Sequence, residues 1–134
     1  MSANILTVDI ITPVKKYSFE GVSAFFAPGK VGKFEILPQH AAMVSEIEVG
    51  IIKIKNNSGE QKIAVSSGYC EINANVIKVL AESAEKNEEI DVQRAEAAKK
   101  RAEERLKMKE SDINAARAEF ALKRAINRIS IKNG

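Results

Sequence analysis

The sequence has few of the residue types on which reactive sites depend. It contains one cysteine, one histidine and no tryptophan among its 134 residues. Cys70 alone cannot form an internal disulfide or a zinc site made of several cysteines. His40 alone supplies no pair of metal ligands, and the chain has no Walker A, GxSxG or HExxH motif. We therefore expect no catalytic site, no metal centre and no required cofactor.

Long apolar runs are also missing. No segment approaches the roughly 20 apolar residues that a membrane-spanning helix needs. The N-terminal residues 1–4 lack a basic region followed by an apolar stretch, so no signal peptide is expected. The expected setting is the cytosol or a membrane face exposed to it.

Glycine, proline and arginine are distributed unevenly along the chain. All three prolines and six of the seven glycines precede residue 69, whereas all six arginines follow residue 90. The first 87 residues carry nine lysines and nine acidic residues, and the remainder carries twelve basic and nine acidic residues. The net charge of +3 therefore belongs to the second part. This asymmetry predicts two differently built parts, residues 1–86 and residues 87–134.

The first part contains short segments in which apolar and polar residues alternate, separated by turn residues. The segments begin at Leu6, Tyr17, Val22, Ile52, Ile63, Tyr69 and Val76. Such spacing is typical of an antiparallel β-sandwich or a small barrel. Residues 56–59 and 73–75 predict hairpin turns. Cys70 lies in one of these segments and is expected to be buried.

The second part is rich in helix-forming residues and, up to residue 133, has no glycine or proline. Asp91 predicts one helix N-cap, and residues 111–112 predict a break and a second N-cap. Two apolar stripes have helical spacing: Ala95, Ala98, Ala102 and Leu106, then Ala115, Ala118, Leu122, Ala125 and Ile129. These patterns favour an antiparallel two-helix hairpin of marginal stability, because alanine buries little area. A second ridge of Ile113, Ala116 and Phe120 is expected to face away from the first.

The arginines fall on one ridge of each helix. At 100° per residue, Arg94, Arg101 and Arg105 lie within about 40° of one another, as do Arg117, Arg124 and Arg128. The ridges fit solvated faces with charge pairs along each helix. They also fit a polyanion site, for example for a triphosphate, because guanidinium groups match phosphate oxygens. No nucleic-acid partner is expected, since the net charge is small and the helices carry one aromatic residue.

Several segments, in this order and spacing, resemble a known family. They are 6–13, 27–41 (family pattern APGxxGxxGILPGHAP), 66–72 (SGGFLEV), 79–85 (VLADTAE) and, most specifically, 89–98. Together they resemble the epsilon subunit of bacterial F-type ATP synthases over nearly the whole chain. The resemblance implies a non-catalytic rotor subunit of the central stalk, peripheral on the cytoplasmic face of the bacterial plasma membrane. Its association with the membrane would be indirect, through the complex.

The resemblance also implies partners and a regulatory movement. The sandwich of this family joins the gamma subunit to the c-ring. The hairpin permits catalysis when folded against the sandwich, and it inhibits ATP hydrolysis when extended along gamma towards the alpha/beta hexamer. The contact loop with gamma and the c-ring would comprise Gly29, Lys30, Val31, Gly32, Lys33, Phe34, Glu35 and His40.

Some members of this family bind regulatory ATP through an I(L)DxxRA motif, which this chain carries intact. By resemblance, the ATP-binding residues here would be Glu85, Ile90, Asp91, Arg94, Ala95, Arg101, Arg124 and Arg128. ATP would be a regulatory ligand and not a substrate.

The chain departs from the family pattern in the contact loop. Glu35 and Gln39 replace glycines, Ala42 replaces a proline, and Lys33 stands where an acidic residue is frequent. Ser67 replaces the first glycine of the SGG pattern. The reversed charge at Lys33 predicts a c-subunit loop with a compensating acid. An alternative function is a free-standing protein–protein adaptor outside a rotary ATPase, and an enzyme is the least favoured class.

Overall fold

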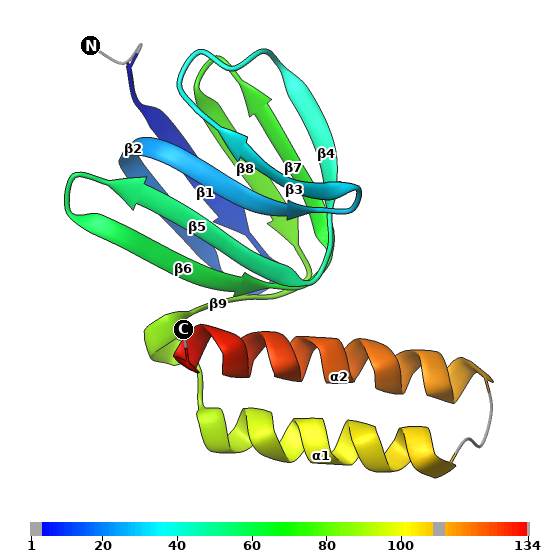
Figure 1. Ribbon diagram of the computed structural model, residues 1–134. Helices are drawn as coiled ribbons and strands as arrows, with labels where there is room; N and C mark the ends of the chain where they lie inside the picture. The colour runs from blue at the N-terminus through cyan, green and yellow to red at the C-terminus, as the bar shows by residue number, and fades with distance from the viewer. Residues whose placement is uncertain (1–3, 109–111, 134) are drawn as a thin grey trace.

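The computed structural model has a β-sandwich followed by two helices, so the predicted α+β class is confirmed (Figure 1). It describes residues 4–108 and 112–133, with side chains for 4–108 and 115–132. The strands are β1 (Leu6–Ile11), β2 (Lys16–Gly29), β3 (Gly32–Ile36), β4 (Met43–Ile47), β5 (Gly50–Asn56), β6 (Gly59–Val65), β7 (Gly68–Asn73), β8 (Val76–Ala81) and β9 (Ala84–Lys86). A 3-10 helix, η2 (Asn87–Glu89), leads to α1 (Val92–Met108) and α2 (Asp112–Asn133).

The long strand β2 belongs to both layers of the sandwich. Its first half pairs with β1, and its second half pairs with β3 on one side and β5 on the other. The prediction of two separate strands here was wrong. Gly21 adopts a φ of 63°, which is unfavourable for a residue with a Cβ, and β2 continues through this point with a shift in its register against β1.

The two layers share β2 and are otherwise distinct. One contains β1, β8, β7 and β4, and the other contains β3, β2, β5, β6 and β9. The pairings of these strands are antiparallel except that of β1 with β8, which is parallel. These two strands are far apart in the sequence, so no tight turn dictates their direction.

Both predicted hairpin turns are confirmed. Asn56 pairs with Gly59 at the end of β5 and β6, and Asn73 pairs with Val76 at the end of β7 and β8. In the second turn the two central residues have φ values of 51° and 64°, as a type I′ turn requires.

The inward-facing residues of both layers form one core. Phe25, Leu6, Ile10 and Ile52 are among its largest fully buried side chains. Cys70 is buried in the same core, as predicted. Alternation along β7 and β8 places the intervening residues on the outer face.

The hairpin has the alanine seam that the sequence predicts. Ala95 and Ala102 of α1 and Ala118 and Ala125 of α2 are buried. Of the expected second ridge, Ala116 is exposed and Phe120 is half-buried, while the Ile113 side chain and Ser111 lie outside the described residues. Neither helix, over its described residues, is long and apolar enough to cross a bilayer.

Enlarging one seam residue tests how closely the two helices approach. We expect Ala125→Leu to lower the free energy of unfolding by about 1–3 kcal/mol, because a fully buried alanine has no room for three more carbons. Ala116→Leu is the matched control on the exposed side of α2, with an expected change within about 0.5 kcal/mol. Urea unfolding of the full chain, followed by circular dichroism at 222 nm, measures both. Equal effects would contradict a closely packed seam.

Candidate functional site

The end of α2 holds the hairpin against the sandwich. Figure 1 shows α2 lying between the sandwich and α1. Ile131 is buried with Ile90 and Ala64, and half-buried Ile51 packs against them. One turn earlier, the Asn127 amide donates a hydrogen bond to the Gly50 carbonyl at 2.7 Å. The docked position of the hairpin therefore depends on a short part of α2.

Two of the predicted arginines lie at this interface. Arg128 Nε donates a hydrogen bond to the Glu85 carboxylate of β9 at 2.5 Å, and the two form an ion pair. The Arg124 guanidinium stacks on the Phe120 ring at 4.9 Å from its centroid. Arg124 Nε is buried and has no hydrogen-bond partner among the described residues. A buried guanidinium N–H without an acceptor is costly, so this atom is ready to bind one.

Arg124, Arg128 and Glu85 line a small cavity between the sandwich and α2. Its volume is about 10 Å³, which is room for about one water molecule. Ser66 and Ser83 line the sandwich side, where the Ser83 hydroxyl donates to the Ser66 hydroxyl oxygen at 3.0 Å. The cavity is too small for a nucleotide without rearrangement.

The residues of the I(L)DxxRA motif have structural roles at the start of α1. Asp91 is the helix N-cap, as predicted, because its carboxylate accepts the Arg94 backbone N–H at 3.1 Å. Ile90 and Ala95 are buried. Arg94 and Arg101 are exposed on α1 and do not line the small cavity. The structure thus brings together Glu85, Arg124 and Arg128 of the predicted set.

The predicted contact loop forms the hairpin of β2 and β3. Val31 at its tip is 100% exposed, and the Lys30 ammonium pairs with the Glu46 carboxylate at 3.2 Å. Lys33 and Glu35 are exposed, and half-buried Phe34 packs on the core. His40 lies beyond β3, so the five residues of this strand separate it from the tip. Gly29 and Gly32 pair across the turn.

Gln39 occupies a position where the resembled family has glycine. Its φ of 70° lies in the left-handed region, which is unfavourable for a residue with a Cβ. Its backbone N–H donates to the Asn75 side-chain oxygen at 2.6 Å, which ties this loop to the turn between β7 and β8. The loop therefore has the left-handed backbone conformation typical of glycine, although the residue at this position is glutamine.

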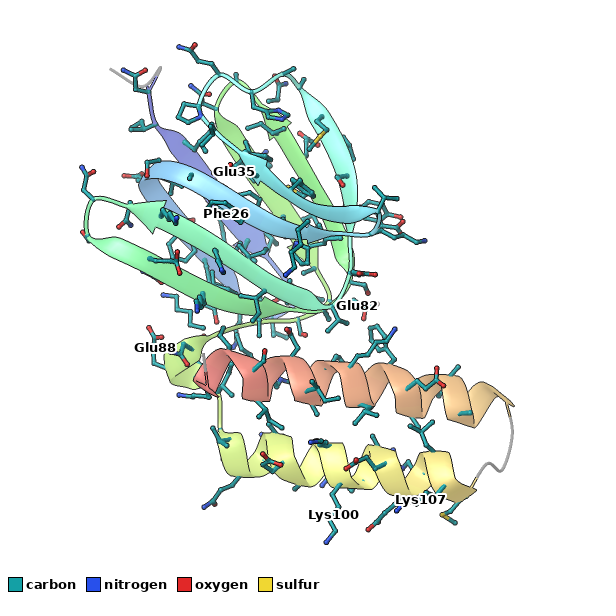
Figure 2. The ribbon with its side chains drawn as sticks, viewed as in Figure 1. Phe26, Glu35, Glu82, Glu88, Lys100 and Lys107 are labelled. Atoms are coloured by element: carbon teal, nitrogen blue, oxygen red, sulfur yellow. The ribbon has the colours of Figure 1, made fainter. Side chains whose placement is uncertain are left out.

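Two grooves open on the sandwich surface. One, of about 600 Å³, runs beside the outward-facing Ile11, Leu80 and Tyr69, which are neighbours across β1, β8 and β7. Leu80 and Tyr69 are largely exposed apolar side chains. The other, of about 810 Å³, lies between the outer face of β2, β3 and β5 and the end of α2, where Figure 2 labels Phe26 and Glu35.

Sequence reasoning missed four residues of the interface: Asn127, Ile131, Ser66 and Ser83. Asn127 lies between the two arginines in the sequence of α2, but its partner is a main-chain carbonyl that no sequence pattern marks. The serines are 17 residues apart in the sequence and meet because the strands on either side of them pair, β6 with β9 and β7 with β8. The described residues include no group of three or more histidine, cysteine or acidic side chains placed to hold a metal ion.

Comparison with known families covers both parts of the chain. Residues 5–87 match the model for the ATP synthase delta/epsilon chain β-sandwich domain. Residues 88–133 match the model for the long α-helix domain of the same chains. The chain belongs to the ATP synthase delta/epsilon family. The resemblance found in the sequence is thereby confirmed.

Individual members of the delta/epsilon family are similar to this chain in sequence over most of their length. The ATP synthase epsilon chain of Pelotomaculum thermopropionicum is 45% identical over 109 residues, covering 81% of each chain. That of Desulforamulus reducens is 46% identical over 105 residues, covering 78% of this chain and 80% of the relative. Among solved structures, a chain in Euglena gracilis mitochondrial ATP synthase (OSCP/F1/c-ring) has a TM-score of 0.77 at 20% identity. The superposition covers 90% of this chain and 76% of the Euglena chain. At 20% identity the match shows a common fold and nothing more.

Removing the N-cap tests the local role of Asp91. We expect Asp91→Ala to lower the free energy of unfolding by about 0.5–2 kcal/mol, because an N–H in the first turn of α1 loses its acceptor. Asp91→Ser keeps an oxygen that can cap the helix and should retain most of the stability. Urea unfolding of the full chain distinguishes the variants. Equal stability of the alanine variant and the unsubstituted chain would contradict the capping role.

Proposed function

We propose that this chain is the epsilon-type rotor subunit of an F-type ATP synthase, without a catalytic site of its own, and that its hairpin regulates ATP hydrolysis. The observation that carries the proposal is the match of both family models, in order, over residues 5–133. The sandwich would join gamma to the c-ring. The subunit would be peripheral at the cytoplasmic face of the bacterial membrane, through the complex.

The outer face of the sandwich supports a protein partner. Tyr69 and Leu80 expose large apolar areas beside the groove of about 600 Å³, and Ile11 continues this row on β1. Such a row of exposed apolar side chains marks a protein contact. We assign this face to gamma, and the fully exposed Val31 with Lys33 and the His40 loop to the contacts at the c-ring.

The docking contacts support a hairpin that can move. One buried isoleucine of α2, one hydrogen bond from Asn127 and one partly exposed ion pair of Arg128 hold it to the sandwich. Neither Arg94 nor Arg101 of α1 adds an ion pair within the described residues. A two-state hairpin with a small free-energy difference suits regulation, because a partner or ligand can shift its population. In the extended state the arginines would face the alpha/beta hexamer.

Deleting the hairpin tests the regulatory role. A chain truncated after Lys86 keeps all nine strands, so we expect it to assemble with gamma and the c-ring. ATP hydrolysis by the reconstituted complex should rise, because the inhibitory segment is gone. Unchanged hydrolysis would contradict inhibition by the hairpin. A stable complex of the full chain that contains neither gamma nor c would favour the adaptor function instead.

We also propose that ATP binds the docked hairpin as a regulatory ligand. The buried Arg124 Nε without an acceptor fits a phosphate oxygen. Arg128 would exchange Glu85 for phosphate, and Arg94 and Arg101 would contribute from α1. The small volume of the cavity means that the Glu85–Arg128 pair must open for a nucleotide to enter. ATP supplies no chemistry here, and its binding would stabilise the docked state by mass action.

Calorimetry of the full chain with ATP tests this site. We expect heat of binding for the unsubstituted chain and its loss in Arg94→Ala. Lys107→Ala is the matched control, because it also removes one positive charge from α1 but at a side chain directed away from the sandwich (Figure 2). Asp91→Ser separates capping from binding, since it keeps an acceptor for the helix N–H and removes the carboxylate. No heat at millimolar ATP would leave the motif with its structural role alone.

A further inference from the structure

The connector between the sandwich and the hairpin carries a cluster of polar contacts that the docking interface does not use. η2 brings Glu89 back to the beginning of β2. The Glu89 carboxylate accepts hydrogen bonds from the Tyr17 hydroxyl and from the Lys86 backbone N–H at 2.9 Å. The Lys15 ammonium lies 3.5 Å from its other oxygen. We call Lys15, Tyr17, Lys86 and Glu89 the connector cluster.

Cation–π contacts add to this cluster. The Lys86 ammonium lies 5.1 Å from the centroid of the Tyr17 ring and 5.5 Å from that of Phe19. Both distances are within the range of attraction between a cation and a ring face. Lys86 therefore reaches back to β2, although its own backbone belongs to β9.

The sandwich side of the connector cluster is itself held in place. The buried Thr12 hydroxyl accepts the Lys15 backbone N–H at 2.9 Å, and the Thr12 N–H donates to the Lys15 carbonyl at 2.9 Å. This turn leads directly into β2, which places Tyr17 next to Lys15. The side-chain donors that meet Glu89, those of Lys15 and Tyr17, thus come from this turn and from β2.

The connector needs such an anchor, because β9 is short. It has three residues, and it pairs only with β6 in the described structure. Glu85, the partner of Arg128, lies in this strand, one residue before Lys86. Immediately after Glu89 come buried Ile90 and the helix cap Asp91. The connector cluster therefore provides the last polar side-chain contacts with the sandwich before the hairpin begins, and Ile90, which packs on Ala64, follows it directly.

The pKa shifts of Glu89 and Tyr17 agree with this geometry. The hydrogen bond from Tyr17 holds the pKa of Glu89 below its ordinary value. Burial and the contact with Glu89 raise the pKa of Tyr17 above its ordinary value. At neutral pH the acceptor is therefore charged and the donor is protonated, as the hydrogen bond requires.

We propose that the connector cluster keeps residues 84–89 on the sandwich and sets the pivot of the hairpin at Ile90–Asp91. Tyr17 and Glu89 act as positioning residues: they hold β9, and with it Glu85, where α2 docks. The proposal rests on the movable hairpin proposed above. It adds that the fraction of molecules with a docked hairpin depends on the position of the pivot as well as on the docking contacts.

The test measures the distance between two spin labels in the full chain. The labels are attached at Asn57→Cys, in the turn between β5 and β6, and at Lys100→Cys, on α1 facing away from the sandwich (Figure 2). Cys70 can stay, because burial raises its pKa to about 12 and the thiol does not react. We expect Glu89→Gln and Tyr17→Phe each to lower the ratio of docked to undocked hairpin about three- to tenfold. The double variant should lower it no further than the stronger single change, because Glu89→Gln removes the charge of the acceptor and Tyr17→Phe removes the donor of the same hydrogen bond.

The controls separate the connector cluster from the hairpin movement. Glu46→Gln removes an exposed carboxylate from the ion pair with Lys30, away from the connector, and should leave the ratio unchanged. Ile131→Ser removes a docking contact and should undock the hairpin. If Ile131→Ser undocks the hairpin while Glu89→Gln and Tyr17→Phe do not, the role of the connector cluster is overturned and the movable hairpin stands. If no variant changes the distance, the movable hairpin is overturned as well.

One further measurement guards against a general loss of folding. Thermal unfolding of the Glu89→Gln and Tyr17→Phe variants should keep the midpoint of the sandwich within a few degrees of the unsubstituted chain. A much lower midpoint would assign these residues to the stability of the sandwich and overturn their proposed role at the pivot.

Discussion

Ile131 packs against Ile90 and Ala64, and this contact decides where the hairpin lies relative to the sandwich. The hydrogen bond of Asn127 and the ion pair of Arg128 lie within one turn of it on α2. Because the remaining length of α2 packs on α1, the hairpin behaves as one unit attached at one end. The position of the arginines, the small cavity and the accessibility of the motif all depend on this attachment.

The sequence predicted those features that local patterns determine. Alternation along residues 69–80 located β7 and β8, and the asparagines between them located their turn. The alanine spacing located the seam, and Asp91 was recognisable as a cap because its position precedes an uninterrupted run of helix formers. In each case the residues that determine the structure lie within one or two turns, or one hairpin, of each other.

The features that the sequence did not predict depend on contacts between distant segments. Gly21 resembles a strand terminator, but β2 pairs with β1 and β5 on either side of this residue, and these pairings carry the strand through it. The short β9 has no alternating pattern of its own and exists because the edge of β6 is available. Similarly, the helix wheel placed Arg94 and Arg101 on one ridge and Arg124 and Arg128 on another. It could not show that only the second pair lies against the sandwich, since that depends on how the hairpin docks.

The energies of the docking contacts explain why so small an attachment suits the proposed regulation. Burial of one isoleucine contributes about 1.5–3 kcal/mol, one hydrogen bond about 0.5–1.5 kcal/mol, and a partly exposed ion pair about 0–1 kcal/mol. A ligand that binds only the docked state at a hundred times its dissociation constant adds about 2.7 kcal/mol. The two quantities are similar in size, so a ligand or a competing protein surface can decide which state is populated. A wide apolar face of leucines against the sandwich would hold the hairpin too firmly for either to displace it, whereas a single anchoring isoleucine leaves a free-energy difference that a ligand or a protein partner can overcome.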